Sequence, residues 1–475
     1  MKSKKLQDAL GMIDHDLIAD AEKAPKKKTK HVIKWTAPIA AMLAIALAFG
    51  IFFGQNSPFV PTAYALAEAE YPNIPKFADY SDKDAYDAWR DAQKRQAEYF
   101  GKAKGLEPFI SATVSEFLGN AGDKNLVYSP LNVYLALAIL AETTDGETRE
   151  QILALLGAED IESLRENANT LWNANYNDDG IVTSLLASSL WLRNGVGYHT
   201  DTLNTIAKHY YASSFSGEMG SEEYNKQLQE WLDKQTGGLL SEQIQNVEFD
   251  PETIFAIATT IYFKASWATE FSKEETTDDI FHEKERDVMT EFMHRSASSY
   301  IWQGEHFSAA ELPLTDSGSM WFLLPDEDID LNTLLKDTEA LSFISQSNKY
   351  QWEDKVHATV NYSIPKFDVN SDLDLIEGLK ALGVTDCFLE NADFTPITTE
   401  VEDLYVSKVN HSARVKIDEE GLIAAAFTLI EITTESASEQ EPPYVDFTVD
   451  RPFIFVITGE DGSILFVGAV NHVSK

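Results

Sequence analysis

Apolar residues recur at helical spacing in the N-terminal half of the chain and at strand spacing in the C-terminal half. Residues 108–122 and 132–157 show the helical repeat, and the second range predicts two helices around a turn at Asp145-Gly146. Runs of β-branched and aromatic residues predict strands at 253–267, 320–325, 358–367, 452–458 and 463–470. The last two flank a hairpin turn at 459–462. Helices and strands gathered in separate parts of the chain are typical of an α+β fold.

An uncharged run of 20 residues, 35–54, lies near the N-terminus. A helix of this length crosses a hydrocarbon core of about 30 Å. The preceding residues, 1–34, carry nine lysines against five acidic residues, and the next charge after the run is Glu68. This asymmetry predicts a basic cytoplasmic tail at 1–34 and a transmembrane signal-anchor at 35–54. An extracytoplasmic linker and solvated helix at 55–104 and a single large domain at 105–475 are expected to follow.

A cleaved secretory signal is the alternative interpretation of the N-terminus. Small residues near Ala65–Ala69 would supply the cleavage site, and the protein would then be secreted. The apolar run is longer than a usual signal core, which favours the uncleaved anchor. Both alternatives put the main body outside the cytoplasm. A lysine-flanked span on an acidic ectodomain indicates a bacterial cell surface.

Composition removes several classes of function. The chain has 77 acidic and 38 basic residues and a formal net charge of −39, which disfavours nucleic-acid binding. Its one cysteine, Cys387, excludes an intramolecular disulfide and a cysteine-rich metal site. The sequence lacks the nucleophile elbow, the phosphate-binding loop, the dinucleotide-binding fingerprint and the zinc-protease motif. No enzymatic activity, metal or cofactor is therefore predicted.

The segment 421–430, GLIAAAFTLI, is unusual for its place in the chain. It has no charge and no proline, and it runs into the polar, proline-containing stretch 431–443. Alternate residues fall on two faces as in a strand. Three consecutive alanines are poor strand formers, but they are small enough to enter between strands already in place. Composition alone also allows an ordinary buried strand or helix.

The residues around this segment resemble the reactive-loop hinge of the serpin family of protease inhibitors. Eight further blocks resemble serpin motifs in the family's order: 125–132, 253–267, 281–282, 322–326, 364–367, 407–411, 450–453 and 465–468. Together the blocks span nearly the whole region from Leu106 to the C-terminus, and residues 1–104 have no counterpart among them. The resemblance implies a serpin fold, with helices of the N-terminal half on a large central sheet, further sheets and an exposed reactive-centre loop.

The resemblance also implies a mechanism. A serine, and in some cases a cysteine, endopeptidase attacks the loop as a substrate. The cut loop then inserts as a new strand into the central sheet, and the covalently attached protease is distorted. Such an inhibitor is expected to be a monomer with no cofactor. Its partners are then a target endopeptidase and, through residues 35–54, a membrane.

Residue by residue, the resemblance assigns four sites. The reactive bond falls at Glu435-Ser436, with Thr433 to Ala437 left open by uncertainty in the register. The hinge comprises Glu419, Glu420, Gly421, Leu422, Ile423, Ala424, Ala425, Ala426 and Thr428. The breach, where insertion begins, comprises Trp267, Lys366 and Glu419. The shutter, a polar cluster where the sheet opens, comprises Ser129, Asn132, Thr259 and His411.

Two departures from the family pattern leave a second function open. Leu422 stands where serpins usually carry a small Thr or Ser, and Thr259 stands where they generally carry Asn. A slow first step of insertion would turn an inhibitor into a substrate, so a non-inhibitory binding or structural serpin is the alternative. For an inhibitor, Glu435 at the cleavage site predicts a glutamate-specific protease. Cleavage beside Thr434 or Ala437 predicts an elastase-like or subtilisin-like enzyme.

Overall fold

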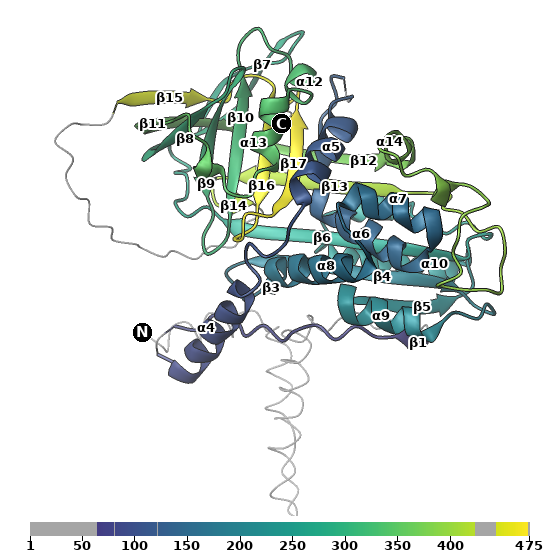
Figure 1. Ribbon diagram of the computed structural model, residues 1–475. Helices are drawn as coiled ribbons and strands as arrows, with labels where there is room; N and C mark the ends of the chain where they lie inside the picture. The colour runs from purple at the N-terminus through teal and green to yellow at the C-terminus, as the bar shows by residue number, and fades with distance from the viewer. Residues whose placement is uncertain (1–63, 80, 121, 423–442, 474–475) are drawn as a thin grey trace, which may run out of the picture. The chain divides into compact units, whose positions relative to one another are not determined.

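Two large β-sheets organise the part of the chain that the structure describes (Figure 1). This computed structural model describes residues 64–79, 81–120, 122–422 and 443–473. All of these belong to the unit Val60–Lys475. The predicted tail 1–34 and apolar span 35–54 lie outside the described residues. Within the described ranges, none of the helices combines the length and apolar character needed to cross a bilayer.

The first sheet, called the central sheet below, contains the segment that precedes the predicted loop. Its strand order is β1 (Tyr64–Ala67), β5 (Ala212–Gly217), β4 (Thr183–Arg193), β6 (Phe255–Ser266), β14 (Gly421–Leu422), β13 (Asn410–Asp418) and β12 (Phe367–Asp374), and β3 (Asn177–Asp178) pairs with β4. All neighbours are antiparallel except β4 and β5. The predicted strand 358–367 is divided between the two sheets, because β11 (Lys355–Pro365) belongs to the second sheet and β12 starts at Phe367 in the central sheet.

The second sheet receives the chain after the predicted loop. Its order is β15 (Tyr444–Thr448), β11 (Lys355–Pro365), β8 (Asp287–Gln303), β9 (Phe307–Pro313), β10 (Ser319–Pro325), β16 (Phe453–Thr458), β17 (Ile464–Val470) and β2 (Leu126–Tyr128), and β7 (Thr277–His282) pairs with β8. The hairpin predicted at 459–462 joins β16 and β17, and its turn is closed by a hydrogen bond from Gly459 N to Ser463 O.

The helices lie mainly in the first half of the described chain, as the spacing predicted. They are α4 (Lys83–Ala97), α5 (Leu106–Leu118), α6 (Pro130–Thr143), α7 (Gly146–Leu156), α8 (Ile161–Asn175), α9 (Thr200–Tyr210), α10 (Glu222–Gln235), α11 (Ser241–Ile244), α12 (Leu331–Leu334), α13 (Thr338–Ser345) and α14 (Ile376–Ala381). The range 132–157 does form two helices, and α7 begins directly after Asp145. The α+β prediction is confirmed.

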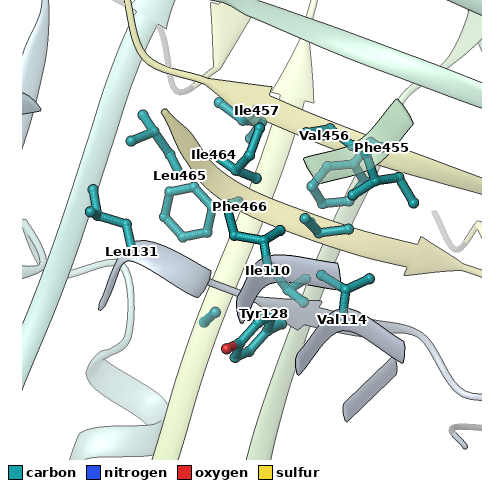
Figure 2. Close-up of a cluster of buried hydrophobic side chains, with 14 of the residues drawn as sticks. Ile110, Val114, Tyr128, Leu131, Phe455, Val456, Ile457, Ile464, Leu465 and Phe466 are labelled. Atoms are coloured by element: carbon teal, nitrogen blue, oxygen red, sulfur yellow. The ribbon is translucent and has the colours of Figure 1, made fainter. Parts of the chain in front are cut away.

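Helix α6 connects the two sheets, because it packs against β6 of one and β17 of the other. Its start is well defined: Ser129 caps the helix by accepting from Asn132 N, and Pro130 occupies the first turn, where a missing N–H costs nothing. Nearly every residue of α6 is buried. Figure 2 shows part of the surrounding core, where Leu131 of α6 and Ile110 of α5 lie among side chains of β16 and β17.

The N-terminal segment 64–104 is packed against the domain along its described length. Strand β1 adds an edge to the central sheet by pairing with β5. The ring of Tyr71 lies 5.5 Å from that of the fully buried Trp172, and its hydroxyl donates to Tyr211 O at 3.1 Å. The sequence pattern predicts a linker and a solvated helix here. Helix α4 is indeed mostly exposed, but its described surroundings are those of a docked segment.

A buried carboxylate holds helix α4. Asp179, which is fully buried, accepts from Trp89 Nε1 at 2.9 Å and Gln93 Nε2 at 2.7 Å. The same side chain also accepts from the backbone of Ile181 and Val182 in the turn before β4. Hydrogen bonds to a charged acceptor are stronger than neutral ones, so this group of contacts ties α4 firmly to the turn.

Candidate functional site

The central sheet has an interrupted ladder between β6 and β13. Only β14 joins them: Gly421 lies opposite Ser266 of β6 and Asp418 of β13, and Leu422 lies opposite Ala265 and Ile417. In the described ranges, no residue of β6 pairs directly with a residue of β13. Beyond Leu422, the place between the facing edges of β6 and β13 holds no ladder partner among the described residues. We call this place the slot.

Gly421 is required where the chain enters the slot. Its φ angle is 147°, in the region that side chains with a Cβ rarely adopt. A Cβ at this position would lie 2.4 Å from Ala265 O and 2.6 Å from Ser266 Cα. The backbone of the neighbouring strand leaves no room for a side chain, which explains why the hinge needs glycine.

Leu422 is already buried as part of the sheet. Its side chain is 3% exposed, and its partners Ala265 and Ile417 are each 1% exposed. The sequence leaves open whether a large side chain here slows insertion. In the structure the Leu422 side chain is buried in the core cluster, and burial of an apolar side chain is favourable.

A cavity lies next to Leu422 between the strands of the slot. On the core side it is lined by Phe263 of β6, Val415 of β13, Ile457 of β16 and Phe466 of β17. Arg414, on the alternate face of β13, lines it from the other side. A strand continuing past Leu422 would thus meet apolar side chains on the core face and polar ones on the opposite face.

The breach residues meet at the turn between β13 and β14. Trp267 is 2% exposed, and its ring nitrogen donates to Asp418 O at 2.8 Å while its backbone N–H donates to Glu420 O. Phe271 N donates to Glu419 O at 3.0 Å. Trp267 therefore holds the turn on both sides of Glu419, through its ring nitrogen on one side and its backbone N–H on the other.

The second contact of the breach is an ion pair. Lys366 Nζ lies 3.2 Å from Glu419 Oε1 and 3.3 Å from Glu291 Oε2, and Thr276 Oγ1 donates to Glu419 at 2.9 Å. Burial alone would raise the pKa of Glu419. Hydrogen bonds from its own backbone N–H, Thr276 and Lys366 outweigh burial and hold this pKa below its ordinary value. The carboxylate is thus charged and largely satisfied.

The shutter residues meet at the start of α6. Ser129 is fully buried; its N–H donates to His411 Nε2 at 3.0 Å and its hydroxyl donates to Leu465 O at 2.6 Å. Asn132 Nδ2 donates to Thr259 O at 3.4 Å, so Thr259 contributes its backbone carbonyl to this bond. The cluster links α6 to β6, β13 and β17.

His411 is an uncharged member of this cluster. Because its Nε2 accepts a hydrogen bond from Ser129 N–H, that nitrogen carries no proton. Burial lowers the pKa of the imidazole to about 4. The ring therefore stays neutral at physiological pH, and a proton on Nε2 would break the bond to Ser129.

The structure brings together seven of the residues predicted from the sequence at the breach and shutter, and it places Glu420, Gly421 and Leu422 at the mouth of the slot. The remaining predicted residues lie outside the described ranges: Ile423, Ala424, Ala425, Ala426, Thr428, Glu435 and Ser436. Two further residues, Thr276 and Phe271, hold Glu419 and were not predicted from the sequence. No local motif marks either of them, and only the folded breach shows their role.

The family of this chain follows from a match to a known family model. Residues 108–473 match the family model described as Serpin (serine protease inhibitor). The chain belongs to the serpin family. Membership supports protease inhibition in general, and it confirms the serpin fold predicted from the sequence.

Several relatives extend this result. Leukocyte elastase inhibitor of Sus scrofa is 31% identical over 356 residues, which cover 73% of this serpin and 93% of the relative. Serpin-ZXA of Oryza sativa is 29% identical over 74% of this chain and 91% of its own length. These relatives come from an animal and a plant, so they lend no support to the predicted bacterial origin.

Among solved structures, the native state of tengpin, a thermophilic serpin, matches with a TM-score of 0.68 at 24% identity. The match covers 87% of this chain and all of tengpin. An identity this low shows the fold alone.

Proposed function

We propose that this serpin is an extracytoplasmic suicide inhibitor of serine endopeptidases. The protease nucleophile attacks the carbonyl carbon of Glu435, the peptide bond to Ser436 breaks, and Ser436 leaves with a proton as a new amino terminus. An ester then joins the protease to Glu435. The cut loop enters the slot as a strand before water hydrolyses the ester, and the attached protease is pulled out of its active geometry.

The observation that carries this proposal is the register of β14. Gly421 pairs with Ser266 of β6 and with Asp418 of β13. Thr428 comes seven residues after Gly421. On the two neighbouring strands, Thr259 comes seven residues before Ser266 and His411 comes seven residues before Asp418. A strand continued in the same register sets Thr428 between the two shutter strands.

Alternation along the same strand puts Ala424 and Ala426 on the core face with Leu422. Ala425 falls on the opposite face, beside Arg414. A segment that looks out of place as a loop therefore fits the slot as a strand.

Insertion is energetically favourable for two reasons. The new strand pairs its backbone N–H and C=O groups with the open edges of β6 and β13. Its apolar core face leaves water at roughly 25 cal/mol per Å² of apolar surface. The small alanines add little bulk, so the strand enters a packed sheet without forcing it far apart.

The target protease is set by the cleavage residue. Glu435 in this position supports a glutamate-specific serine endopeptidase, and a bond shifted toward Thr434 or Ala437 supports an elastase-like or subtilisin-like enzyme. Some cysteine endopeptidases form the equivalent thioester and belong to the same proposal. The name of the pig relative, leukocyte elastase inhibitor, supports the elastase-like alternative.

The cellular location belongs to the proposal as well. The lysine-rich tail and the apolar run 35–54 support an uncleaved anchor that leaves the inhibitory domain outside the cytoplasm. Protease treatment of intact expressing cells should digest the domain while sparing an N-terminal fragment. A domain that is reached only after cell lysis would contradict this location.

The test is covalent complex formation. The soluble domain, residues 64–475, would be mixed with glutamate-specific, elastase-like and subtilisin-like proteases and boiled in SDS. The proposal expects a complex of the summed mass and a released C-terminal peptide whose mass gives the scissile bond. Cleavage of the loop by these proteases without a complex would overturn suicide inhibition and favour the non-inhibitory alternative.

A further inference from the structure

Strands β15, β11 and β8 lie side by side at one edge of the second sheet (Figure 1) and share one solvent-facing side. Tyr300 of β8 lies opposite His357 of β11. Two residues further along β11, Thr359 lies opposite Ser298 of β8 and Tyr444 of β15. Because side chains alternate along a strand, these five residues point to the same side of the sheet. His357 is exposed and Tyr444 is 72% exposed, so this side faces solvent.

A third row continues this side of the sheet and holds its one carboxylate. Asn361 lies opposite Ser296 and Asp446. Ser296 Oγ donates to Asn361 Oδ1 at 2.6 Å, and Asn361 Nδ2 donates to Asp446 Oδ1 at 2.8 Å. We call the three rows the open face, and none of its residues is a lysine or an arginine. Tyr, Ser and Asn are typical of adaptable protein-binding surfaces, and the centres of such surfaces are depleted of charge.

The aromatic rings at one end of the open face are held in place by their neighbours. The ring of Tyr300 lies 5.0 Å from that of His357 and 6.4 Å from that of Tyr350, edge to face in both cases. Tyr350 is 49% exposed, and its hydroxyl donates to the buried carboxylate of Glu311. Ser298 Oγ lies 3.2 Å from His357 Nε2. Side chains fixed in this way lose little entropy on binding, and tyrosine is a frequent hot spot of protein interfaces.

The end of the face that carries Tyr300 and His357 is also where the chain enters β15. Strand β15 runs parallel to β11, and Thr359 N donates to Pro443 O at 2.8 Å just before β15 begins. Ser436, at the proposed cleavage site, precedes Pro443 by seven residues, a reach of at most about 25 Å. An endopeptidase of about 230 residues is about 45 Å across from the size scaling of compact domains. A protease that holds the loop is therefore tethered close to this end by a chain shorter than its own width.

We propose that the open face is a second docking surface for the target endopeptidase, which contacts it with the surface beside its cleft while the cleft holds the loop. This inference rests on the proposed function, because the loop is what brings the protease to this edge of the sheet. A second copy of this chain is the less suitable occupant, because two chains that each carry a net charge of −39 repel one another. The open face offers hydrogen bonds and rings, so the protease surface that fits it is uncharged, and the contact should depend little on salt.

The experiment changes the face without changing the loop. In the full chain in detergent, Tyr300→Ala combined with His357→Ala removes the paired rings, and Thr359→Lys separately adds a charge at the centre of the face. The matched control is Ile280→Ala combined with Met289→Ala, which removes another exposed cross-strand pair at the far end of β8. Each form would be mixed with a protease that the parent chain traps, and the rate of complex formation would be measured at low and at high salt. The Kd for the same protease with its catalytic serine replaced by alanine, the share of loop cleaved without trapping and the melting temperature complete the set.

The proposal expects both changes to the face to slow complex formation about tenfold, as the loss of an interface hot spot does, and to weaken binding of the inactive protease by a similar factor. For the ring-removing variant this factor should be the same at both salt concentrations. The share of loop cleaved without trapping and the melting temperature should stay at the parent values, as in the control. Parent-like rates in both variants would overturn the docking surface, and so would a parent dimer that the variants dissociate. A parent chain that is cleaved but traps no protease would instead remove the proposed function, and the docking surface with it.

Discussion

Lys366 Nζ and Glu419 Oε1 lie 3.2 Å apart, two residues before the backbone of Gly421 passes between β6 and β13. The pair holds the turn between β13 and β14, which leads into the proposed reactive loop. Its strength therefore bears on how readily the strands part at this end. The partly buried Glu419 also accepts from Thr276, whereas the nearby Glu420 pairs with the exposed Lys273.

Loss of the Glu419 side chain should destabilise the breach. Glu419→Ala leaves Lys366 with Glu291 alone and Thr276 with only the longer bond to Ser272 O at 3.5 Å, at a cost of about 1–3 kcal/mol. The melting temperature of the uncleaved domain should fall by several degrees. Glu420→Ala is the matched control and should change it much less, because exposed ion pairs contribute little. Equal shifts for the two variants would contradict a special role for the breach pair.

The buried His411 predicts a loss of stability on mild acidification. Its pKa is lowered to about 4 in the folded protein, against about 6.5 when unfolded. The unfolded chain therefore binds the proton first, and stability that is full above pH 6.5 is lost as the pH falls toward 4. This shift corresponds to about 3 kcal/mol.

The measurement is the melting temperature as a function of pH. His411→Gln keeps a neutral acceptor for Ser129 N–H and should flatten the profile between pH 6.5 and 4. His199→Gln, at an exposed position, should leave the profile of the parent protein intact. A profile that keeps its slope in His411→Gln would show that another group is responsible.

Matched charges on the two faces of the loop test the register. Ala426→Glu should block insertion, because in the register of β14 the carboxylate would be buried between Ile261 and Ala413. An added barrier of about 1.4 kcal/mol slows insertion tenfold, so cleavage without trapping should dominate. Ala425→Glu, on the face of Arg414, should still form complex. The reverse order of the two variants would show that the loop enters with the opposite face inward.

Much of the domain was predictable because its elements carry local signals. The strand at Phe255–Ser266 is rich in β-branched and aromatic residues, and α6 opens with a Ser-Pro cap. The breach and shutter residues were predicted from the resemblance to serpins. That resemblance identifies the residues but not the hydrogen bonds and ion pairs that they make. Thr259 accepts a hydrogen bond through its backbone carbonyl, and Thr276 donates one to Glu419. Both bonds join segments that are distant in the sequence.

Strand β1 is the clearest feature that the sequence did not predict. Its four residues, YALA, lie in an alanine-rich stretch that is equally typical of a signal-peptide end or a linker. Only the open edge of β5, some 150 residues away, makes them a strand. The docking of α4 was not predicted for the same reason. In the sequence Asp179 looks like part of an ordinary polar turn, and only the folded structure brings Trp89 and Gln93 beside it.

Loop insertion is tested most directly by amide hydrogen exchange in the domain before and after a single cut in the loop. Peptides covering β6 and β13 carry the open edges of the slot. If the cut loop fills the slot, both strands should become strongly protected after cleavage, β16 should not change, and the melting temperature should rise sharply. Unchanged exchange in β6 and β13 with an unchanged melting temperature would contradict insertion.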